Sequence, residues 1–372
     1  MRYLFDQQTP ALVIFNILLV IFIYMSMKRS LYYPFHVPRI NRRFVILLFY
    51  VFVLFSFWGQ DWFHYRNIYP QLLNGEKEHM ETIYIHIAQY LSFNYTSFRL
   101  VIWGSAIYLF LKMIKSLHIN NDIAFFVFGS IWLIWFSYAR ASLAMILAYF
   151  GMTVLMMPSK RKFISVVSGL IVLFSSVFFH KSAAFALILI LLTFLSNYLN
   201  RKVFIFCMCV SMVLAYIYLP SFIADFMTLD ASESDTNLIL AGQGYMSNDD
   251  SAMGIAAMLL RFFEVLPYYI LAFVSLKLIS KNNKYNLPND IVIFSRLLLF
   301  IVIASSFFMM NLSVNTSVIY MRFLRFAAIP SVVVLSYLLE NKIFYKLSKA
   351  ALMLGIFSTM STLLYALYNT IV

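Results

Sequence analysis

Two arginines three positions apart have a spacing that is typical of an anion-binding site. Arg322 and Arg325 occur in the stretch YMRFLRF, inside an apolar run. Residues i and i+3 lie on one face of a helix, so the two guanidinium groups would repel each other unless an anion lay between them. Arginine holds phosphate oxygens through paired hydrogen bonds. The pair therefore predicts a phosphate or diphosphate site, with an acidic side chain elsewhere in the chain as the alternative partner.

Further ionisable side chains interrupt apolar runs elsewhere. Arg140 lies in FSYARASLAM and His180 lies in FFHKSAAF. Arg140 could bind an anion or only extend to a polar interface, and His180 could be a general base or a structural histidine. Arg261 and Glu264 are one helical turn apart, so they could form an ion pair with each other or contribute to a site. Each of these residues is a candidate for function with a structural alternative.

The stretch FSFWGQDWFHYRNIYPQ, residues 55–71, brings a carboxylate and aromatic rings together. Asp61, Tyr65 and Tyr69 are spaced i, i+4 and i+8, so a helix would place them on one face. Asp61 could act as a base or orient one. Tyr65, Tyr69 and Trp62 could stack against sugar rings. The alternative for these aromatic residues is a place in the lipid-facing belt or in the core.

The composition identifies the environment in which these side chains must be positioned. Hydrophobic residues make up 63% of the chain, charged residues 12%, and the mean hydropathy is +0.84. An integral membrane protein is expected, since a soluble surface needs more charge. No Gly- or Pro-rich linker divides the chain, so residues 1–372 are predicted to form one membrane domain. The net charge of +13 fits basic cytoplasmic loops, and no nucleic-acid partner is expected.

Apolar runs of membrane-spanning length predict about twelve transmembrane helices in an all-α polytopic bundle. The predicted spans are 11–27, 44–58, 98–114, 122–138, 141–157, 163–179, 182–198, 203–219, 255–276, 291–310, 318–339 and 350–368.

Charge in the connecting loops predicts the orientation of the bundle. Every second loop is basic, whereas the loop 220–254 carries six acidic residues and no Lys or Arg. The positive-inside rule then puts both termini, the loop 220–254 and an external segment 59–97 outside the cytoplasm. Residues 76–93 of that segment are predicted to form an interfacial amphipathic helix, and the acidic loop a mobile lid or a disordered segment. All the candidate residues above fall near the outer side, whereas Arg296 falls near the cytoplasmic half and is interpreted as a snorkelling or packing residue.

Several short motifs occur in an order that resembles a known family. They are Gly59-x-Asp61-x-x-x-Tyr65-x-x-x-Tyr69, Arg140 followed by an Ala-rich helix, and Phe179-His180-Lys181-Ser182-Ala183. Over about residues 40–340 the chain resembles the EpsG family of bacterial exopolysaccharide proteins, which is similar to Wzy-type polysaccharide polymerases. Trp62 stands where the family more usually has Tyr. The residues matched to the motifs are Asp61, Tyr65, Tyr69, Arg140 and His180.

The resemblance implies a GT-C-like bundle in the bacterial inner membrane that polymerises exopolysaccharide, capsule or O-antigen repeat units on the outer face. A polyprenyl diphosphate-linked oligosaccharide would be the donor and a lipid-linked repeat unit the acceptor. Membrane lipid, a chain-length regulator and a flippase would be its partners. On this basis Arg140, Arg261, Arg322 and Arg325 are assigned to the diphosphate, Tyr65, Tyr69, Trp62 and Glu264 to the glycan, and His180 or Asp61 to the base. No metal-ligand spacing is present, so no metal or cofactor is expected.

Two other classes of membrane protein also place charge in apolar helices. A lipid-linked oligosaccharide flippase would line a path through both leaflets, and Arg296 is the residue that best fits such a path. A membrane acyltransferase also needs an interfacial histidine, but its acyl-CoA donor would lie on the cytoplasmic side, opposite to His180. The outer location of the charges favours the polymerase.

Overall fold

The structure is a computed structural model that describes residues 95–128, 139–156, 162–180, 183–196, 255–280, 285–309 and 324–371, with short pieces between 69 and 90 and between 206 and 213. Every element in those residues is a helix, which confirms the predicted all-α class for that part of the chain. The elements are α5 (Tyr95–Ser116), α6 (Asn121–Val127), α7 (Ala139–Met156), α8 (Lys162–Phe179), α9 (Ala183–Ser196), α12 (Ile255–Ser280), α14 (Asn289–Met309), η5 (Arg325–Ala327), α16 (Ala328–Glu340) and α17 (Tyr345–Ile371).

The apolar runs located these helices well. Of the predicted spans, 98–114 is α5, 122–138 begins with α6, 141–157 is α7, 163–179 is α8, 182–198 is α9, 255–276 is α12, 291–310 is α14, 318–339 contains η5 and α16, and 350–368 lies in α17. The spans 11–27, 44–58 and most of 203–219 lie outside the described residues. Among the described helices, α12 and α14 each contain a window long and apolar enough to cross a membrane, Phe262–Ile279 and Asn289–Ser306. The number of spans and the location of both termini stay predictions.

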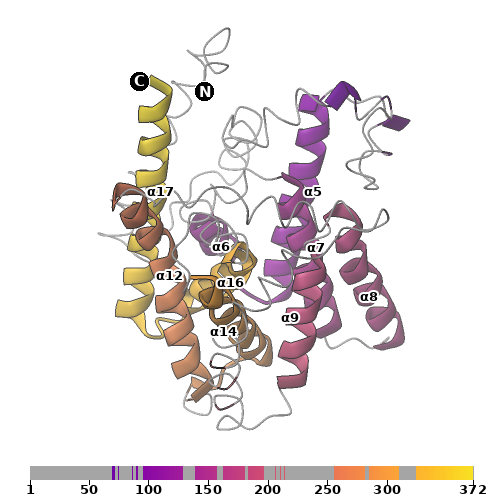
Figure 1. The fold of residues 1–372 in the computed structure, drawn as a ribbon. Helices are drawn as coiled ribbons and strands as arrows, with labels where there is room; N and C mark the ends of the chain where they lie inside the picture. Colours follow the sequence, from indigo (N-terminus) through magenta and orange to yellow (C-terminus); the bar gives the residue numbers. More distant parts are fainter. Residues whose placement is uncertain are drawn as a thin grey trace.

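Two groups of helices meet along α14 and α16 (Figure 1). On one side α7 packs against α5, α8 and α9, and on the other α12 packs against α14 and α17. The two groups are joined because α14 also contacts α9, and α16 contacts α6, α7, α12 and α14. Helix α16 is nearly all apolar and its residues 328–336 are all buried, so it forms the centre of the described structure.

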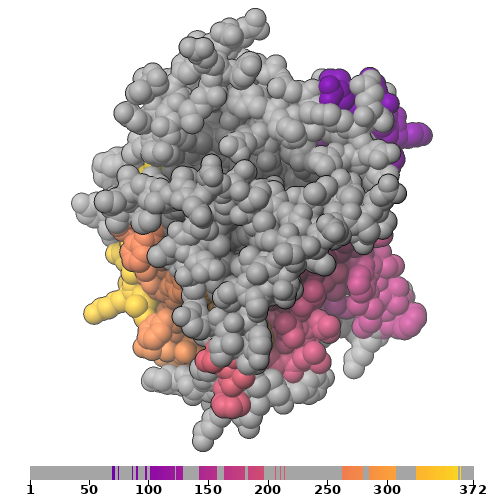
Figure 2. Space-filling model, viewed as in Figure 1, coloured from indigo at the N-terminus to yellow at the C-terminus, as the bar shows by residue number. Residues whose placement is uncertain are grey.

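Apolar side chains cover the outside of α8 and α9 as well as the inside. Phe163 is 80% exposed, and Ile171, Phe174, Phe178 and Leu191 are each more than half exposed. Figure 2 shows both helices at the surface of the molecule. Apolar surface on this scale would be costly in water, but it is favourable against lipid chains. The exterior of this helix pair therefore indicates a lipid-facing surface.

Helices α7 and α8 approach each other closely because glycines lie at their contact. A Cβ atom on Gly151 would lie 2.7 Å from the backbone nitrogen of Leu173, and one on Gly169 would lie 2.8 Å from the side chain of Leu155. Small residues allow the backbones of membrane helices to meet in this way. From the first contact to the second, α7 advances by four residues and α8 moves back by four. The two helices are therefore antiparallel, with a defined register.

Two hydrogen bonds of Asn120 lie where the C-terminal end of α16 meets the start of α6. The N–H of Asn120, just before α6, donates to Glu340 Oε2 at 3.0 Å, and Asn120 Oδ1 accepts from the N–H of Ile123 at 3.3 Å. A carboxylate at a helix N-terminus is favourable because the first N–H groups of the helix have no partners within it. The last residue of α16 thus stabilises the start of α6.

Candidate functional site

The described residues include part of the predicted site. Asp61, Trp62, Tyr65 and Arg322 lie outside them, as do most of the external segment 59–97 and the whole acidic loop 220–254. For Arg140 and Arg261 the structure describes the backbone, at the second residue of α7 and in the second turn of α12. His180, Arg325, Glu264 and Tyr69 are described with their side chains. The assignment of all these residues to a site stays a prediction, and the geometry below states how they are positioned.

The α7–α8 register brings the backbones of Arg140 and His180 to the same end of the helix pair. Gly151 of α7 lies beside Leu173 of α8. Continuing the antiparallel register by seven residues brings His180, which directly follows the end of α8, level with Ala144 of α7, and Arg140 lies four residues, about 6 Å along α7, beyond that level. These two residues are 40 positions apart in the sequence. Their location at one end agrees with the prediction from loop charge, and the register adds how far each lies along the helix pair.

Main-chain hydrogen bonds shape the turn at His180. This residue follows directly after α8 and is half-buried. Its N–H donates to the carbonyl of Ser176 at 3.2 Å, and its own carbonyl accepts from the N–H of Ala183 at 2.9 Å. The first bond continues α8 by one residue and the second leads directly into α9. The imidazole is therefore attached at the C-terminal end of α8, to a residue whose carbonyl is bonded to the first residue of α9.

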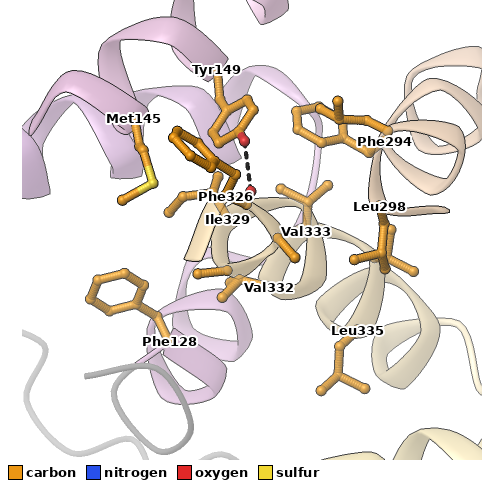
Figure 3. Close-up of a cluster of buried hydrophobic side chains, with 14 of the residues drawn as sticks. Phe128, Met145, Tyr149, Phe294, Leu298, Phe326, Ile329, Val332, Val333 and Leu335 are labelled. Atoms are coloured by element: carbon orange, nitrogen blue, oxygen red, sulfur yellow. Dashed lines mark hydrogen bonds between the residues drawn. The ribbon is translucent and has the colours of Figure 1, made fainter. Parts of the chain in front are cut away.

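Arg325 occupies a 3-10 turn whose shape follows from a nearby proline. It is the first residue of η5 and is half-buried, and its carbonyl accepts from the N–H of Ala328. Pro330 lies in the first turn of α16. Because proline has no N–H, it cannot supply the usual i+4 donor to the carbonyl of Phe326. The hydroxyl of Tyr149 donates to that carbonyl at 2.6 Å (Figure 3).

This bond joins two parts of the predicted diphosphate site. Tyr149 belongs to α7, the helix that begins at Ala139 and Arg140. Phe326 is the residue next to Arg325. The bond lies among buried apolar side chains, including Met145, and both of its residues are buried (Figure 3). The turn that carries Arg325 is thus tied to the helix that carries Arg140.

Tyr69 has a packing role in the structure. Its side chain is only 4% exposed, and its ring centroid lies 5.5 Å from that of Phe98 on α5. Burial raises the pKa of Tyr69 to about 12 because it disfavours the phenolate. The ring therefore contributes to the core, and its assignment to a glycan platform stays a prediction.

Glu264 lies in a part of α12 that is locally irregular. It is half-buried, and Pro267 follows three residues later inside the same helix. That proline leaves the carbonyl of Phe263 without its i+4 donor. Further along α12, the hydroxyls of Tyr269 and Ser306 lie 2.7 Å apart and connect this helix to α14. Glu264 thus lies close to a carbonyl that lacks its usual donor, although α12 continues through the proline as one helix.

Arg296 has a structural partner, which agrees with its interpretation as a packing residue. Its Nη1 donates to the carbonyl of Ser196, the last residue of α9, and lies 3.4 Å from Ser196 Oγ. A cation at a helix C-terminus is favourable, since the last carbonyls have no partners within the helix. Arg296 therefore caps α9 from α14.

Sequence reasoning missed Tyr149. A tyrosine inside the apolar run 141–157 is an ordinary core residue by its pattern, and its partner lies 177 residues away in the sequence. The one local signal in the sequence was Pro330, which leaves the carbonyl of Phe326 without its usual helical donor. The sequence does not indicate which other donor bonds that carbonyl. In the described part of the chain, no group of three or more His, Cys, Asp or Glu side chains could hold a metal ion.

The sequence was compared with known proteins. The sequence model of the EpsG family matches residues 39–372, which include all the candidate residues. Neither the curated proteins nor the solved structures gave a match.

Proposed function

Because the chain belongs to the EpsG family, a family of membrane proteins of polysaccharide biosynthesis that is similar to Wzy-type polymerases, we propose that it polymerises lipid-linked glycan repeat units. The donor is a glycan attached to a polyprenyl diphosphate, and the acceptor is a sugar hydroxyl of a second lipid-linked unit. The reaction takes place at the outer face of the bacterial inner membrane. It serves the synthesis of exopolysaccharide, capsule or O-antigen.

The chemistry explains why arginine and histidine are needed together. The acceptor hydroxyl attacks the anomeric carbon of the donor and forms the new glycosidic bond. The bond from that carbon to the diphosphate breaks, and the polyprenyl diphosphate leaves with the electron pair. Arginines stabilise the charge that develops on the leaving group, and His180 or Asp61 accepts the proton of the hydroxyl. Trp62, Tyr65 and Glu264 contact the sugars, whereas Tyr69, the fourth residue assigned to the glycan, is buried against Phe98 and supports this region from the core.

The antiparallel packing of α7 and α8 is the observation that carries this proposal. It brings the backbone of Arg140, a candidate anion ligand, to the same end as His180, a candidate base. Arg325 is connected to α7 by the bond from Tyr149 to Phe326, about 14 Å along that helix from Arg140. Arg140 and Arg325 therefore bind the diphosphate, together with Arg322 and Arg261.

A flippase would need a charged path through both leaflets, and Arg296 was the main candidate for its inner part. The contact of Arg296 with the end of α9 accounts for this charge as a helix cap. The other candidate charges are those predicted from the sequence to lie near the outer side, which favours the polymerase. A flippase supplies the lipid-linked units, and a chain-length regulator sets the product size.

Reconstitution tests the proposed function directly. The purified protein, in liposomes, is mixed with polyprenyl diphosphate-linked repeat units and no nucleotide sugar, and the products are separated by size. A ladder of elongated glycans is expected. The variant Arg325→Ala should lose the ladder while remaining folded. Movement of the units across the bilayer without any elongation would overturn the proposal in favour of a flippase.

A further inference from the structure

Tyr149 is a buried tyrosine whose hydroxyl donates a hydrogen bond to another helical segment. The side chain is 0% exposed, and the hydroxyl donates to the carbonyl of Phe326 at 2.6 Å. Figure 3 shows the bond within a cluster of apolar side chains that includes Phe294 and Ile329. Water does not compete for a bond in such surroundings, so its loss would leave a buried polar group without its partner.

The position of this bond is set by a break in the helical hydrogen bonding. A regular helix through residues 326–330 would use the N–H of residue 330 to bond the carbonyl of Phe326. Residue 330 is proline, and the chain at residues 325–327 is a 3-10 turn. The hydroxyl from α7 takes the place of the missing donor. A bond that would normally lie inside one helix thus connects two helices.

We infer that Tyr149 is a positioning residue that holds the turn of Arg325 against α7, so that Arg325 can act on the substrate diphosphate together with Arg140. This inference rests on the proposed function. The turn is also held by α14 and α16, which both contact η5. Those contacts preserve the fold when the hydroxyl is removed, whereas the bond to Tyr149 sets the distance between the two arginine-bearing elements. Arg140 lies about 14 Å along α7 from Tyr149, by the rise of a helix.

The test compares two tyrosine-to-phenylalanine variants of the full-length protein in liposomes. Tyr149→Phe removes the hydroxyl that bonds Phe326. Tyr268→Phe is the matched control, because it removes a hydroxyl from a tyrosine on α12 that is 1% exposed. Elongation is inhibited with a short prenyl diphosphate and with the corresponding monophosphate. The ratio of the two inhibition constants measures the preference for a diphosphate. A purely structural role for Tyr149 would not change this ratio.

A second variant separates two effects of the Tyr149 hydroxyl: holding the turn of Arg325 against α7, and supplying a hydrogen-bond donor to the carbonyl of Phe326. Pro330→Ala restores an N–H that can bond the carbonyl of Phe326 within the helix. Added to Tyr149→Phe, it should recover thermal stability without recovering the preference for diphosphate, since the turn is still not tied to α7.

We expect the preference for diphosphate to fall by roughly 10- to 100-fold in Tyr149→Phe and to stay unchanged in Tyr268→Phe. An unchanged ratio in Tyr149→Phe would overturn the inference and leave the proposed function intact. The inference would also be overturned if the double variant Tyr149→Phe with Pro330→Ala recovered the preference for diphosphate together with its thermal stability. Failure of the unmodified protein to elongate the repeat units would overturn the proposed function, and the inference with it.

Discussion

Replacing Gly151 with alanine tests the packing of α7 and α8 on which the candidate site depends. The added Cβ would lie 2.7 Å from the backbone nitrogen of Leu173, 2.9 Å from its Cα and 3.0 Å from the carbonyl oxygen of Gly169. All three are backbone atoms, so no side chain can rotate away. Ordinary contact begins at 3.4 Å, so the helices would have to separate by about 0.7 Å or distort, a type of change that costs about 1–3 kcal/mol.

The higher helix propensity of alanine offsets part of this cost. Alanine is a better helix former than glycine by up to about 1 kcal/mol in water. Subtracting this gain from the cost of about 1–3 kcal/mol leaves a net loss for Gly151→Ala of about 0–2 kcal/mol in the free energy of unfolding. Elongation per folded molecule should fall as well, because the shift moves Arg140 relative to His180.

Gly169→Ala is the matched control on the facing helix. Its Cβ would meet the Cδ2 and Cγ atoms of the Leu155 side chain at 2.8 Å, and a backbone atom only at 3.2 Å. Because Leu155 can change rotamer, this variant should cost clearly less than Gly151→Ala. Thermal unfolding in detergent and the elongation ladder are measured for both variants. A Gly151→Ala protein that is more stable than the unmodified protein, or a larger loss in Gly169→Ala than in Gly151→Ala, would refute the packing described here.

Four further predictions concern single side chains. Arg325→Ala should lower elongation by about 100- to 1000-fold, the cost of losing one charge-stabilising donor, and Arg325→Lys should recover only part of it; equal activity of all three proteins would contradict the assignment. His180→Ala should lower transfer by about 100- to 10,000-fold while the lipid-linked donor still binds, which is measured by separate binding and turnover assays. Arg296→Ala should lower the free energy of unfolding by about 1.5–3 kcal/mol and leave elongation per folded molecule unchanged, because Arg296 caps α9. The pKa of Tyr69 is about 12 in the folded protein and about 10 in the unfolded chain, so the unfolded chain loses this proton first as the pH rises. The free energy of unfolding should therefore fall between about pH 10 and about pH 12. The fall should be smaller in Tyr69→Phe, measured by the same titration.

The helices could be predicted from sequence because their cause is local. An apolar run of the right length becomes a helix in lipid, where each backbone group must be bonded within its own segment. The spans at 98–114 and 163–179 therefore agree with α5 and α8 to within a few residues. The interpretation of Arg296 as a packing residue succeeded for a similar reason, since its depth in the apolar run was visible in the sequence. The burial of Tyr69 was not visible, because it depends on Phe98 of another helix.

By itself, the sequence determined the class of the protein, its helical segments and its family, through composition, run length and the order of short motifs. Tertiary structure alone decided the register of α7 on α8 and the bond that ties the turn of Arg325 to α7. The physical reason is distance along the chain. A helix is specified by bonds between residues four positions apart, whereas Tyr149 and Phe326 are 177 positions apart and meet only when the helices pack.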